Sequence, residues 1–379
     1  MLKKIIIVSI LLFIFCNVSY AVDYSDIFVL YNQKSLKQFT CKGCSFNEKN
    51  NKIEILDKNS YILSPVINLP FYFGEAVPSW NIKCPEKSSF SVFVRFGNDI
   101  ENKNNLSPWL LMGEWNEKCD YSKLKSYISN SKIEGKFDNP FKYLETQIET
   151  DYILSSNNFN QIQFCFIFNI SPNDDVEFSS LSISASTHRG DKKLNLYEKT
   201  NLGKNSYIAV PFRSQGWEDK KISSEICSVV STATVMDYYG VDIKTAELAK
   251  VAYDKRYKMY GMWWRAVQSA HQYGFDGYVR HFRSFEDVKE CIDKKNPVIA
   301  CICVNKNDIA EDPQYETDGH VIVILGFDEN GDILCADGGF RKEEDGILSY
   351  KREEFEKIWF VNGGGIGYFI TPSKKEIFP

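Results

Sequence analysis

The residue of this sequence best suited to nucleophilic chemistry is Cys227. Apolar side chains recur after it at helical spacing and Gly240 follows them, which predicts a helix over residues 225–239. Ser223 or Ser224 can cap the start of that helix, so Cys227 falls in its first turn. There the helix dipole and the free N–H groups favour the thiolate, which lowers the pKa of the cysteine and activates its sulfur. A buried structural cysteine is the alternative interpretation, because free cysteines are commonly buried.

A glutamine twelve residues before the cysteine could assist such a nucleophile. Gln215 ends the segment 210–215, which reads VPFRSQ. Its side-chain amide could donate a hydrogen bond to a developing oxyanion, alongside the backbone N–H of Cys227. The alternative is an ordinary loop glutamine.

His320 is the candidate general base. A glycine precedes it and a buried apolar strand follows it, whereas His271 and His281 lie in or near helical or polar surroundings. His188 stands beside Arg189 in a polar stretch that is typical of a linker. A lone histidine on a strand is more often structural, so the assignment of His320 depends on a partner for its imidazole.

A carboxylate in the next predicted strand supplies that partner. Residues 328–331 (DENG) predict a hairpin turn, and the returning strand leads to Asp337. We expect Phe327 to pair with Asp332 across this turn. Asp337 and His320 then lie diagonally on one face of the sheet, within side-chain reach, unless a β-bulge shifts the register. In that position Asp337 would fix the imidazole tautomer and stabilise its charged form.

The segments around these residues predict an α+β domain over residues 205–379. Helical patterns come first along the chain, and strand patterns follow them. The predicted helices cover residues 225–239, 244–253, 263–273 and 285–293, and the predicted strands cover residues 297–304, 321–327 and 332–336.

Residues 22–200 have a different pattern of apolar and polar residues, which predicts an all-β sandwich. Apolar and polar side chains alternate in residues 89–96, 161–168 and 181–185, and such period-two patterns place one face of a strand in a core. A polar, lysine-rich stretch over residues 188–206 separates this half from the α+β half. The 379 residues therefore divide into two predicted domains.

The N-terminus predicts export. Two lysines precede an apolar run that ends near Cys16, and Ala21 offers a small residue for cleavage, as in a secretory signal peptide over residues 1–21. A membrane anchor is the alternative, but the run is too short to span a bilayer comfortably. No later stretch reaches that length, so we expect a secreted or cell-envelope protein with no stable membrane insertion after signal cleavage.

Charge and cysteine content restrict the remaining classes of function. The net charge of −5 offers no basic field, which argues against nucleic acid as a partner. In an exported protein, some of the cysteines other than Cys16 could pair. Cys41 and Cys44 could form a local disulfide or half of a zinc site, but only Cys84 and Cys119 remain as further ligands in that half. Pairing or free thiols are favoured over zinc, and no metal or organic cofactor is implied.

From Tyr207 to about Pro372 the chain closely resembles the bacteriocin-processing-type cysteine peptidases, cysteine peptidase family 39, in its stand-alone peptidase-like branch. The N-terminal half is similar to the β domain that accompanies such peptidases, at residues 75–81 (EAVPSWN) and 107–115 (SPWLLMGEW). The landmarks that carry the main resemblance are residues 210–215 (VPFRSQ), 226–228 (ICS), 237–241 (DYYGV), 260–263 (YGMW), 296–300 (NPVIA), 319–320 (GH) and 355–359 (FEKIW).

The resemblance implies a papain-like cysteine peptidase domain after the sandwich, and a peptide or protein as substrate. It implies Cys227 as nucleophile, His320 as base and Asp337 as the residue that orients the base. It also implies Gln215 in the oxyanion hole. Two positions depart from the family pattern, because Val229 stands where proline is common and Asp337 is followed by glycine rather than proline.

Two functions from different classes remain. The first is an exported cysteine peptidase that works through an acyl-enzyme. The second is a catalytically decayed peptidase fold that binds a peptide or a glycan at the cell surface; Trp80, Trp109 and Trp115 could stack on sugars, although buried tryptophans are the commoner case. The four filled catalytic positions favour the peptidase. A papain-like acyltransferase with an amine or alcohol acceptor is a third alternative.

Overall fold

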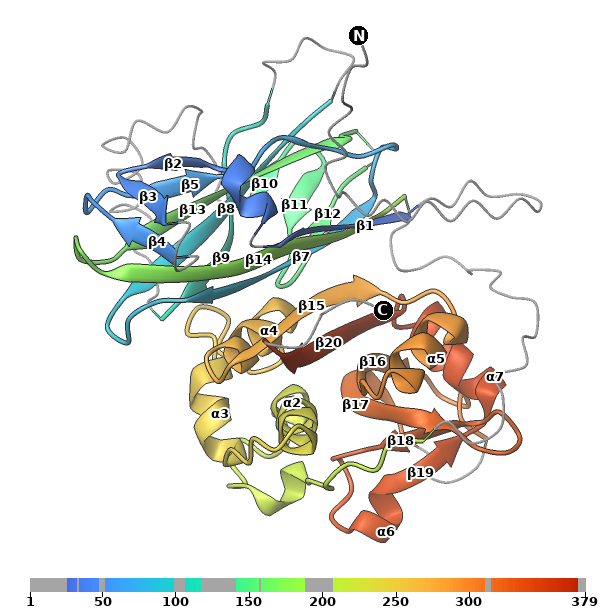
Figure 1. Ribbon diagram of the computed structural model, residues 1–379. Coiled ribbons are helices and arrows are strands. Elements are labelled where there is room, and N and C mark those ends of the chain that lie inside the picture. The colour runs from blue at the N-terminus through green and yellow to red at the C-terminus, as the bar shows by residue number, and fades with distance from the viewer. Residues whose placement is uncertain are drawn as a thin grey trace, which may run out of the picture.

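The structure is a computed structural model, and the strands that it describes form three sheets. Two sheets face each other as a sandwich in the N-terminal half, and the third belongs to the C-terminal half, where the described α-helices also lie (Figure 1). The described residues are 26–32, 34–47, 52–98, 106–116, 141–156, 158–187, 207–310 and 315–373.

The sandwich is built from strands that pair across long sequence distances. Its elements are β1 (Asp26–Asn32), η1 (Ser35–Gln38), β2 (Thr40–Lys42), β3 (Cys44–Asn47), β4 (Lys52–Ile55), β5 (Tyr61–Leu63), β6 (Ile67–Asn68), β7 (Glu75–Lys83), β8 (Ser89–Gly97), β9 (Leu110–Trp115), β10 (Lys142–Tyr143), β11 (Thr146–Ile148), β12 (Ile153–Leu154), β13 (Gln161–Asn169) and β14 (Asp175–Ser186). The first sheet has the order β10-β11-β12-β7-β14-β4-β3, with β1 also paired to β14. The second has the order β2-β5-β13-β8-β9, with β6 paired to β13.

The C-terminal half places helices before most of its strands, and its sheet has the order β15-β20-β16-β17-β18-β19. Its elements are η2 (Gln215–Trp217), α2 (Cys227–Tyr238), α3 (Thr245–Ala252), α4 (Trp263–His271), β15 (Phe275–His281), α5 (Phe285–Asp293), β16 (Val298–Val304), β17 (Thr317–Phe327), β18 (Ile333–Ala336), α6 (Glu343–Gly346), β19 (Ile347–Tyr350), α7 (Arg352–Phe355), the π-helix η3 (Glu356–Val361) and β20 (Ile366–Pro372).

The four predicted helices and three predicted strands of this half are present, with their ends shifted by up to a few residues. The strands β15, β19 and β20 were not predicted. In β15 the letters FDGYVRH show no regular alternation, and Gly277 is there for close approach. A Cβ at this glycine would lie 2.3 Å from the carbonyl oxygen of Phe369 in β20, so only glycine fits without movement.

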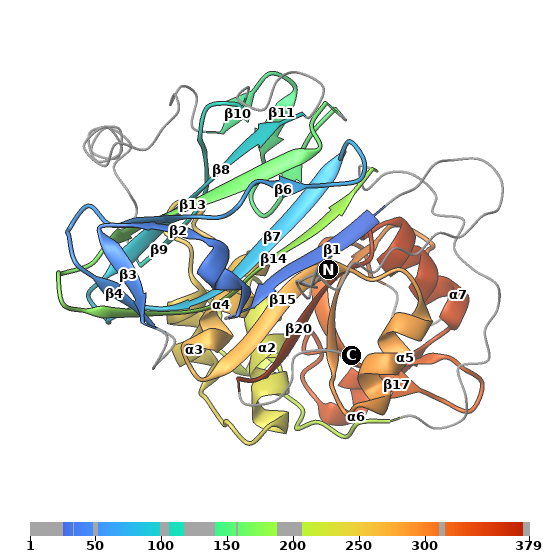
Figure 2. The same cartoon turned by 45° about the horizontal axis from the view of Figure 1, so that its top comes forward.

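The strands β7 and β14 are buried along almost their whole length, whereas the sequence predicted one buried face for this region. The reason is a third layer. The sheet that contains β7 and β14 has the other sandwich sheet on one face and α4 with β15 on the other, as Figures 1 and 2 show. A strand that is covered on both sides has no solvent-exposed face, so its sequence does not alternate regularly between polar and apolar side chains.

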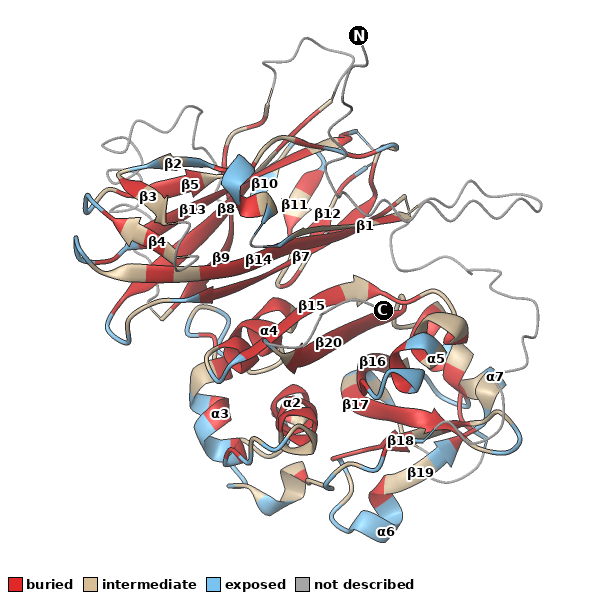
Figure 3. Cartoon of the chain, viewed as in Figure 1, coloured by how far each residue is buried: buried red, intermediate tan, exposed pale blue. Residues whose placement is uncertain are grey.

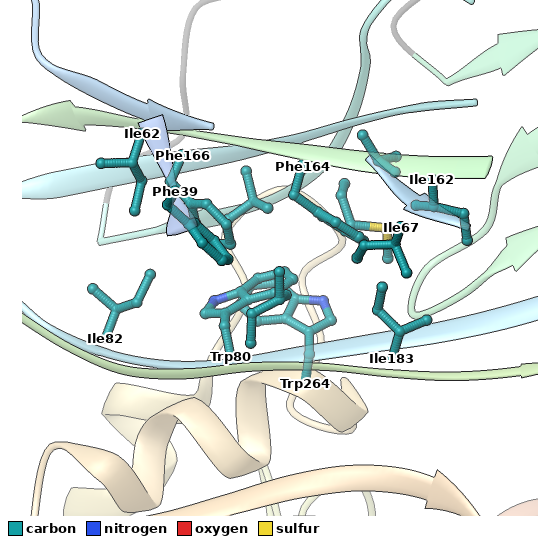
Figure 4. Packing of buried hydrophobic residues seen from close by; sticks show 14 of the residues in the cluster. Phe39, Ile62, Ile67, Trp80, Ile82, Ile162, Phe164, Phe166, Ile183 and Trp264 are labelled. Carbon is teal, nitrogen blue, oxygen red and sulfur yellow. The ribbon is translucent and has the colours of Figure 1, made fainter. Parts of the chain in front are cut away.

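The two halves share a core. Trp264 of α4 is fully buried among sandwich residues, and its ring centroid lies 4.7 Å from that of Trp80 (Figure 4). A Cβ on Gly113 of β9 would lie 2.9 Å from the Trp264 ring, so the sandwich leaves room for this side chain only by having glycine there. One turn along α4, the side-chain oxygen of Gln268 accepts the backbone N–H of Ile82 at 2.9 Å.

The three tryptophans considered for sugar stacking are not available for it. Trp80, Trp109 and Trp115 have 0%, 1% and 2% of their surface exposed. Their rings are core residues of the sandwich, so the expected glycan contact has no support from these side chains.

Several predicted features lie outside the described residues. These are the signal peptide over 1–21, Cys119, His188, and the junction over 188–206, so the division into domains at 200 and 205 stays a prediction. Cys41 and Cys44 are free thiols in the structure, as are the other described cysteines. Within the described part of the chain, no helix has the length and apolar character needed to cross a membrane.

Candidate active site

Cys227 is the first residue of α2. Ile226 takes the N-cap position without a side-chain hydrogen bond, so the helix begins two residues later than predicted, and Ser223 and Ser224 do not cap it. The helix is buried from residue 228 to residue 236 and appears almost wholly as buried in Figure 3. The sulfur-bearing residue is only half-buried. A helix fixed by packing on all sides therefore presents Cys227 at its N-terminal end, where the dipole favours a thiolate.

A hydroxyl one turn further along ties α2 to the strand that carries the candidate base. Ser231 Oγ donates a hydrogen bond to the carbonyl oxygen of Val321 at 2.9 Å, and Val321 follows His320 directly in β17. This bond fixes the position of the helix against the strand. Nothing in the sequence singled out Ser231, because its partner is a backbone carbonyl on a distant element.

The structure brings His320 and Asp337 together. Nε2 of His320 lies 2.6 Å from Oδ1 of Asp337. The same carboxylate oxygen accepts the backbone N–H of Gly339 at 2.8 Å, and Oδ2 accepts the hydroxyl of Tyr350 at 3.3 Å. Because Asp337 has only 1% of its surface exposed, these bonds replace the water that a buried carboxylate loses.

The hairpin reaches this contact by a different path from the predicted one. The predicted pairing of Phe327 with Asp332 is wrong, because Phe327 pairs with Ile333. A β-bulge in the next residues of β17 shifts the register by one. Beyond it Val323 pairs with Ala336, so the end of the hairpin that leads to the aspartate has the predicted register.

The charges of the three groups support one another. Burial would raise the pKa of the Cys227 thiol, but the hydrogen bond and the charge of His320 outweigh it, so that pKa is lowered. Burial disfavours a charged His320, but the Asp337 carboxylate outweighs it and raises the pKa of His320 to about 10. Burial acts against the Asp337 carboxylate, yet His320 holds the pKa of Asp337 below its ordinary value. The three shifts all favour the charged forms, which are thiolate, imidazolium and carboxylate.

Gln215 lies in η2, beside the loop that follows Asp337. Its backbone N–H donates to the carbonyl oxygen of Gly338 at 2.8 Å. Gly338 is tightly packed, because a Cβ there would lie 2.6 Å from Val230 in the first turn of α2. The side-chain oxygen of Gln215 is buried and has no hydrogen-bond partner among the described residues. The backbone of Gln215, the Asp337 loop and the start of α2 thus meet at Gly338.

Two tyrosines that the sequence did not single out complete the surroundings of the imidazole. The Tyr315 ring is edge-on to His320 with centroids 6.1 Å apart, and its hydroxyl lies 3.2 Å from that of Tyr350. Tyr350 in turn donates to Asp337. Tyr350 ends β19, a strand that was not predicted, so no sequence signal placed it near the pair.

The prediction of helical or polar surroundings for His281 is wrong. This residue ends β15, with Nε2 2.8 Å from Oε1 of Glu75 and Nδ1 3.0 Å from Oγ of Ser184. His271 lies in α4, as predicted. Among the described residues, His320 is therefore one of two strand histidines with a carboxylate partner, and the pairing alone does not distinguish it.

Two family models match the chain. Residues 207–365 match the model of the peptidase C39-like family. Residues 57–134 match the model of a peptidase C39 N-terminal domain. No curated protein matches the sequence.

The chain is also similar to solved structures. One is a double glycine motif protease from an AMS/PCAT transporter in complex with the leader peptide, at 19% identity and a TM-score of 0.30, covering 44% of this chain and 94% of that chain. A second is a C39-like peptidase from Bacillus anthracis, at 19% identity and a TM-score of 0.33, covering 43% and 94%. A third is the peptidase domain of Streptococcus ComA, a bifunctional ABC transporter involved in a quorum sensing pathway, at 17% identity and a TM-score of 0.29, covering 39% and 93%.

Proposed function

Because residues 207–365 match the model of the peptidase C39-like family, we propose that the chain is a cysteine peptidase in which Cys227, His320 and Asp337 cleave peptide bonds. One observation carries the proposal. Cys227 starts a buried helix, and Asp337 holds at 2.6 Å the His320 imidazole whose charge helps to lower the pKa of the Cys227 thiol. A cysteine so placed is a stronger nucleophile than an ordinary buried thiol.

In the proposed reaction the Cys227 thiolate attacks the carbonyl carbon of the scissile bond. Nε2 of His320 is bonded to Asp337, so the other ring nitrogen, Nδ1, serves the cysteine and the leaving amine. The imidazolium gives its proton to that amine as the C–N bond breaks, which leaves an acyl-enzyme. His320 then takes a proton from water, whose oxygen attacks the thioester and releases the acid and the free cysteine.

Gln215 is proposed to stabilise the oxyanion of both tetrahedral intermediates. The backbone N–H of Cys227 at the helix start and the Gln215 amide would donate to it together. One fact supports this role: the backbone of Gln215 is anchored to Gly338, which packs against the first turn of α2. A donor that is already in place requires no reorganisation when the charge develops.

The fold, the substrate class and the location of the protein are part of the same proposal. We propose a papain-like fold for residues 205–379, because a helix that begins at the nucleophile precedes a sheet that carries the base. The substrate would be a peptide or protein, as the family implies. The signal-peptide pattern over residues 1–21 supports export to a secreted or cell-envelope location.

Labelling by a thiol-directed electrophile tests the proposal. Iodoacetamide should alkylate Cys227 of the folded full-length chain faster than the same residue in urea, with sites mapped by mass spectrometry. His320→Ala should slow this reaction near neutral pH, because the thiolate loses its counter-charge. Cys303 is the matched control: it is also half-buried, but burial raises its pKa, so it should react slowly in both proteins.

Product analysis then separates the three functions. A peptidase releases a free acid from an unlabelled peptide, whereas an acyltransferase passes the acyl group to an added amine or alcohol. Slow labelling of Cys227 in the folded protein, no faster than in urea, would contradict both and favour the decayed, binding role.

A further inference from the structure

A turn of the N-terminal sandwich reaches the start of α4 in the C-terminal half. The turn joins β11 (Thr146–Ile148) to β12 (Ile153–Leu154) and contains Asp151, which has 6% of its surface exposed. Oδ1 of Asp151 accepts the backbone N–H of Trp263 at 2.8 Å. The N-cap residue of α4, Met262, has no side-chain cap of its own. The sandwich therefore caps this helix and holds its first residue in place.

The next residue of the same turn covers one face of that first residue. The rings of Tyr152 and Trp263 are stacked, with centroids 5.6 Å apart and planes 19° from parallel. Both side chains are half-buried. They pack at the border of one apolar cluster, and Cys227 packs at the border of the same cluster. The stack is therefore a partly open aromatic surface beside the apolar core on which the nucleophile rests.

The order of the strands places this surface on a defined side of His320. Asp337 follows β18, which adjoins β17 on one flank, and β16 adjoins β17 on the other. Cys301 of β16 pairs with the residue after His320. Burial raises the pKa of the Cys301 thiol, and the nearby Cys227 and Asp151 raise it further. Cys301 thus lies on the flank of β17 away from Asp337, near enough to both Cys227 and Asp151 to feel their charges.

We infer that Tyr152 of the sandwich forms, together with Trp263, an apolar subsite for a substrate side chain on the acyl side of the scissile bond. The inference rests on the proposed function. His320 protonates the leaving amine, so the leaving part of the substrate lies toward His320 and Asp337. The acyl part extends to the opposite flank, where the stacked rings offer flat apolar surface to a large aliphatic or aromatic side chain. Tyr152 is then a specificity-determining residue that the N-terminal half supplies to the peptidase.

Irreversible peptide probes test this without knowledge of the natural substrate. Peptidyl acyloxymethyl ketones react when the Cys227 sulfur displaces their carboxylate. The probes would carry Phe or Ala at the second or the third residue before the ketone. In the wild type the Phe probe should react about tenfold faster than the Ala probe at one of these positions, the scale expected for an apolar pocket. In Tyr152→Ala that ratio should fall close to one, while the rate with iodoacetamide stays the same.

Two further variants keep the outcome decisive. Tyr152→Leu retains apolar volume at the turn and serves if the alanine variant does not fold. Its Phe-to-Ala rate ratio should lie between those of the wild type and Tyr152→Ala. Tyr31 is the matched control, because it is a half-buried sandwich tyrosine that packs edge-on against Phe39 with centroids 5.5 Å apart. Tyr31→Ala should leave the Phe-to-Ala ratio unchanged.

The possible failures are distinguishable. If iodoacetamide and the probes label Cys227 but the ratio is the same in the wild type and both Tyr152 variants, this inference is wrong and the proposed function stands. An equal loss of selectivity in Tyr31→Ala would also overturn it, because the effect would then come from the stability of the sandwich. If no reagent reacts preferentially with folded Cys227, the proposed function fails and the subsite fails with it.

Discussion

Two histidines of this molecule have nearly the same surroundings and lie in very different places. His320 has Asp337 on Nε2 at 2.6 Å and a cysteine as its other neighbour. His281 has Glu75 on Nε2 at 2.8 Å and Ser184 on Nδ1 at 3.0 Å. Judged only by the order of groups around the ring, either could be the centre of a catalytic triad.

The two sites differ in how exposed the nucleophile candidate is to a substrate and in what stabilises its charged form. Ser184 stands within β14 with 1% of its surface exposed, and its Oγ also accepts the backbone N–H of His281 at 3.0 Å. No substrate carbonyl can reach it, and it starts no helix that would stabilise an alkoxide. Cys227 is half-buried at a helix N-terminus. The comparison teaches that a hydrogen-bonded row of groups does not make an active site. In this protein such a row also fastens the sandwich to the C-terminal half.

Alanine substitution at each histidine should give the largest contrast. His320→Ala should abolish peptide cleavage in a protein that still folds, because the buried Asp337 carboxylate keeps its hydrogen bonds from Gly339 and Tyr350. His281→Ala should leave the cleavage rate of the folded protein nearly unchanged. It should lower the free energy of unfolding by about 1–3 kcal/mol, because the buried Glu75 carboxyl loses its partner. Peptide cleavage assays and urea unfolding of the same preparations measure both effects.

The reverse pattern would overturn the assignment. Normal cleavage by His320→Ala, together with loss of cleavage in a well-folded His281→Ala protein, would make the interface histidine the catalytic one. Loss of cleavage in both would show that the interface controls the geometry of the site.

Separation of the two halves should remove cooperative folding. A fragment of residues 207–379 would expose Trp264, whose burial alone is worth about 1.5–3 kcal/mol, and would leave the buried polar side chains of Gln268 and His281 without their sandwich partners. We expect the fragment to lack the sharp urea transition and the near-ultraviolet circular dichroism of the full chain. A fragment that unfolds cooperatively and still cleaves peptide would show that the shared core is dispensable.

Two glutamines, of which Gln215 is partly buried and Gln268 fully buried, extend the same comparison. Gln215→Ala should lower kcat by about 10²–10³ with little change in KM, because the amide would meet a charge that develops only in the transition state. Gln268→Ala should act on stability instead, since this side chain bonds the backbone of Ile82 across the two halves. A normal kcat in Gln215→Ala would mean that it is only a loop residue.

The sequence predicted the local geometry of the proposed site better than the contact between the halves, and the reasons are physical. The place of Cys227 near a helix start and the contact of His320 with Asp337 could be predicted because a helix start and a hairpin are local patterns that constrain geometry over few residues. The register error at Phe327 was cancelled by the bulge, which the isolated glycine at position 326 could have signalled. Gln215 could be singled out only by its position before the cysteine.

The contact between the halves had no such signal. Trp264 reads as an ordinary apolar residue of an amphipathic helix, and its partner Trp80 is far away in the sequence. The setting of His281 could not be predicted from its neighbours in the sequence, because its partners, Glu75 and Ser184, come from another sheet. Tertiary pairing of this kind depends on the whole fold and leaves no period or spacing in the chain.

The smallest expected effect concerns pH, and it again separates the two histidines. The thiolate–imidazolium pair exists only between the pKa of Cys227, which is lowered, and that of His320, which is raised to about 10. Below the lower value the sulfur carries a proton and is a poor nucleophile. Above the upper value the imidazole is neutral and has no proton for the leaving amine. Cleavage should therefore rise as the pH passes the lowered pKa of Cys227 and fall as the pH rises through about 10. Both limbs of this profile belong to the coupled pair rather than to one residue each.

Substitution of the two carboxyl groups should move this profile in one case only. Asp337→Asn keeps an oxygen that can accept a hydrogen bond from Nε2 of His320. It removes the carboxylate charge, which is the largest of the effects that raise the pKa of His320 against burial. The alkaline limb should therefore shift to lower pH, with partial loss of activity and an intact fold. Glu75→Gln is the matched control at His281, and it should leave both limbs where they are. An alkaline limb that stays in place in Asp337→Asn, or that moves in Glu75→Gln, would contradict the assignment of His320 as the group that protonates the leaving amine.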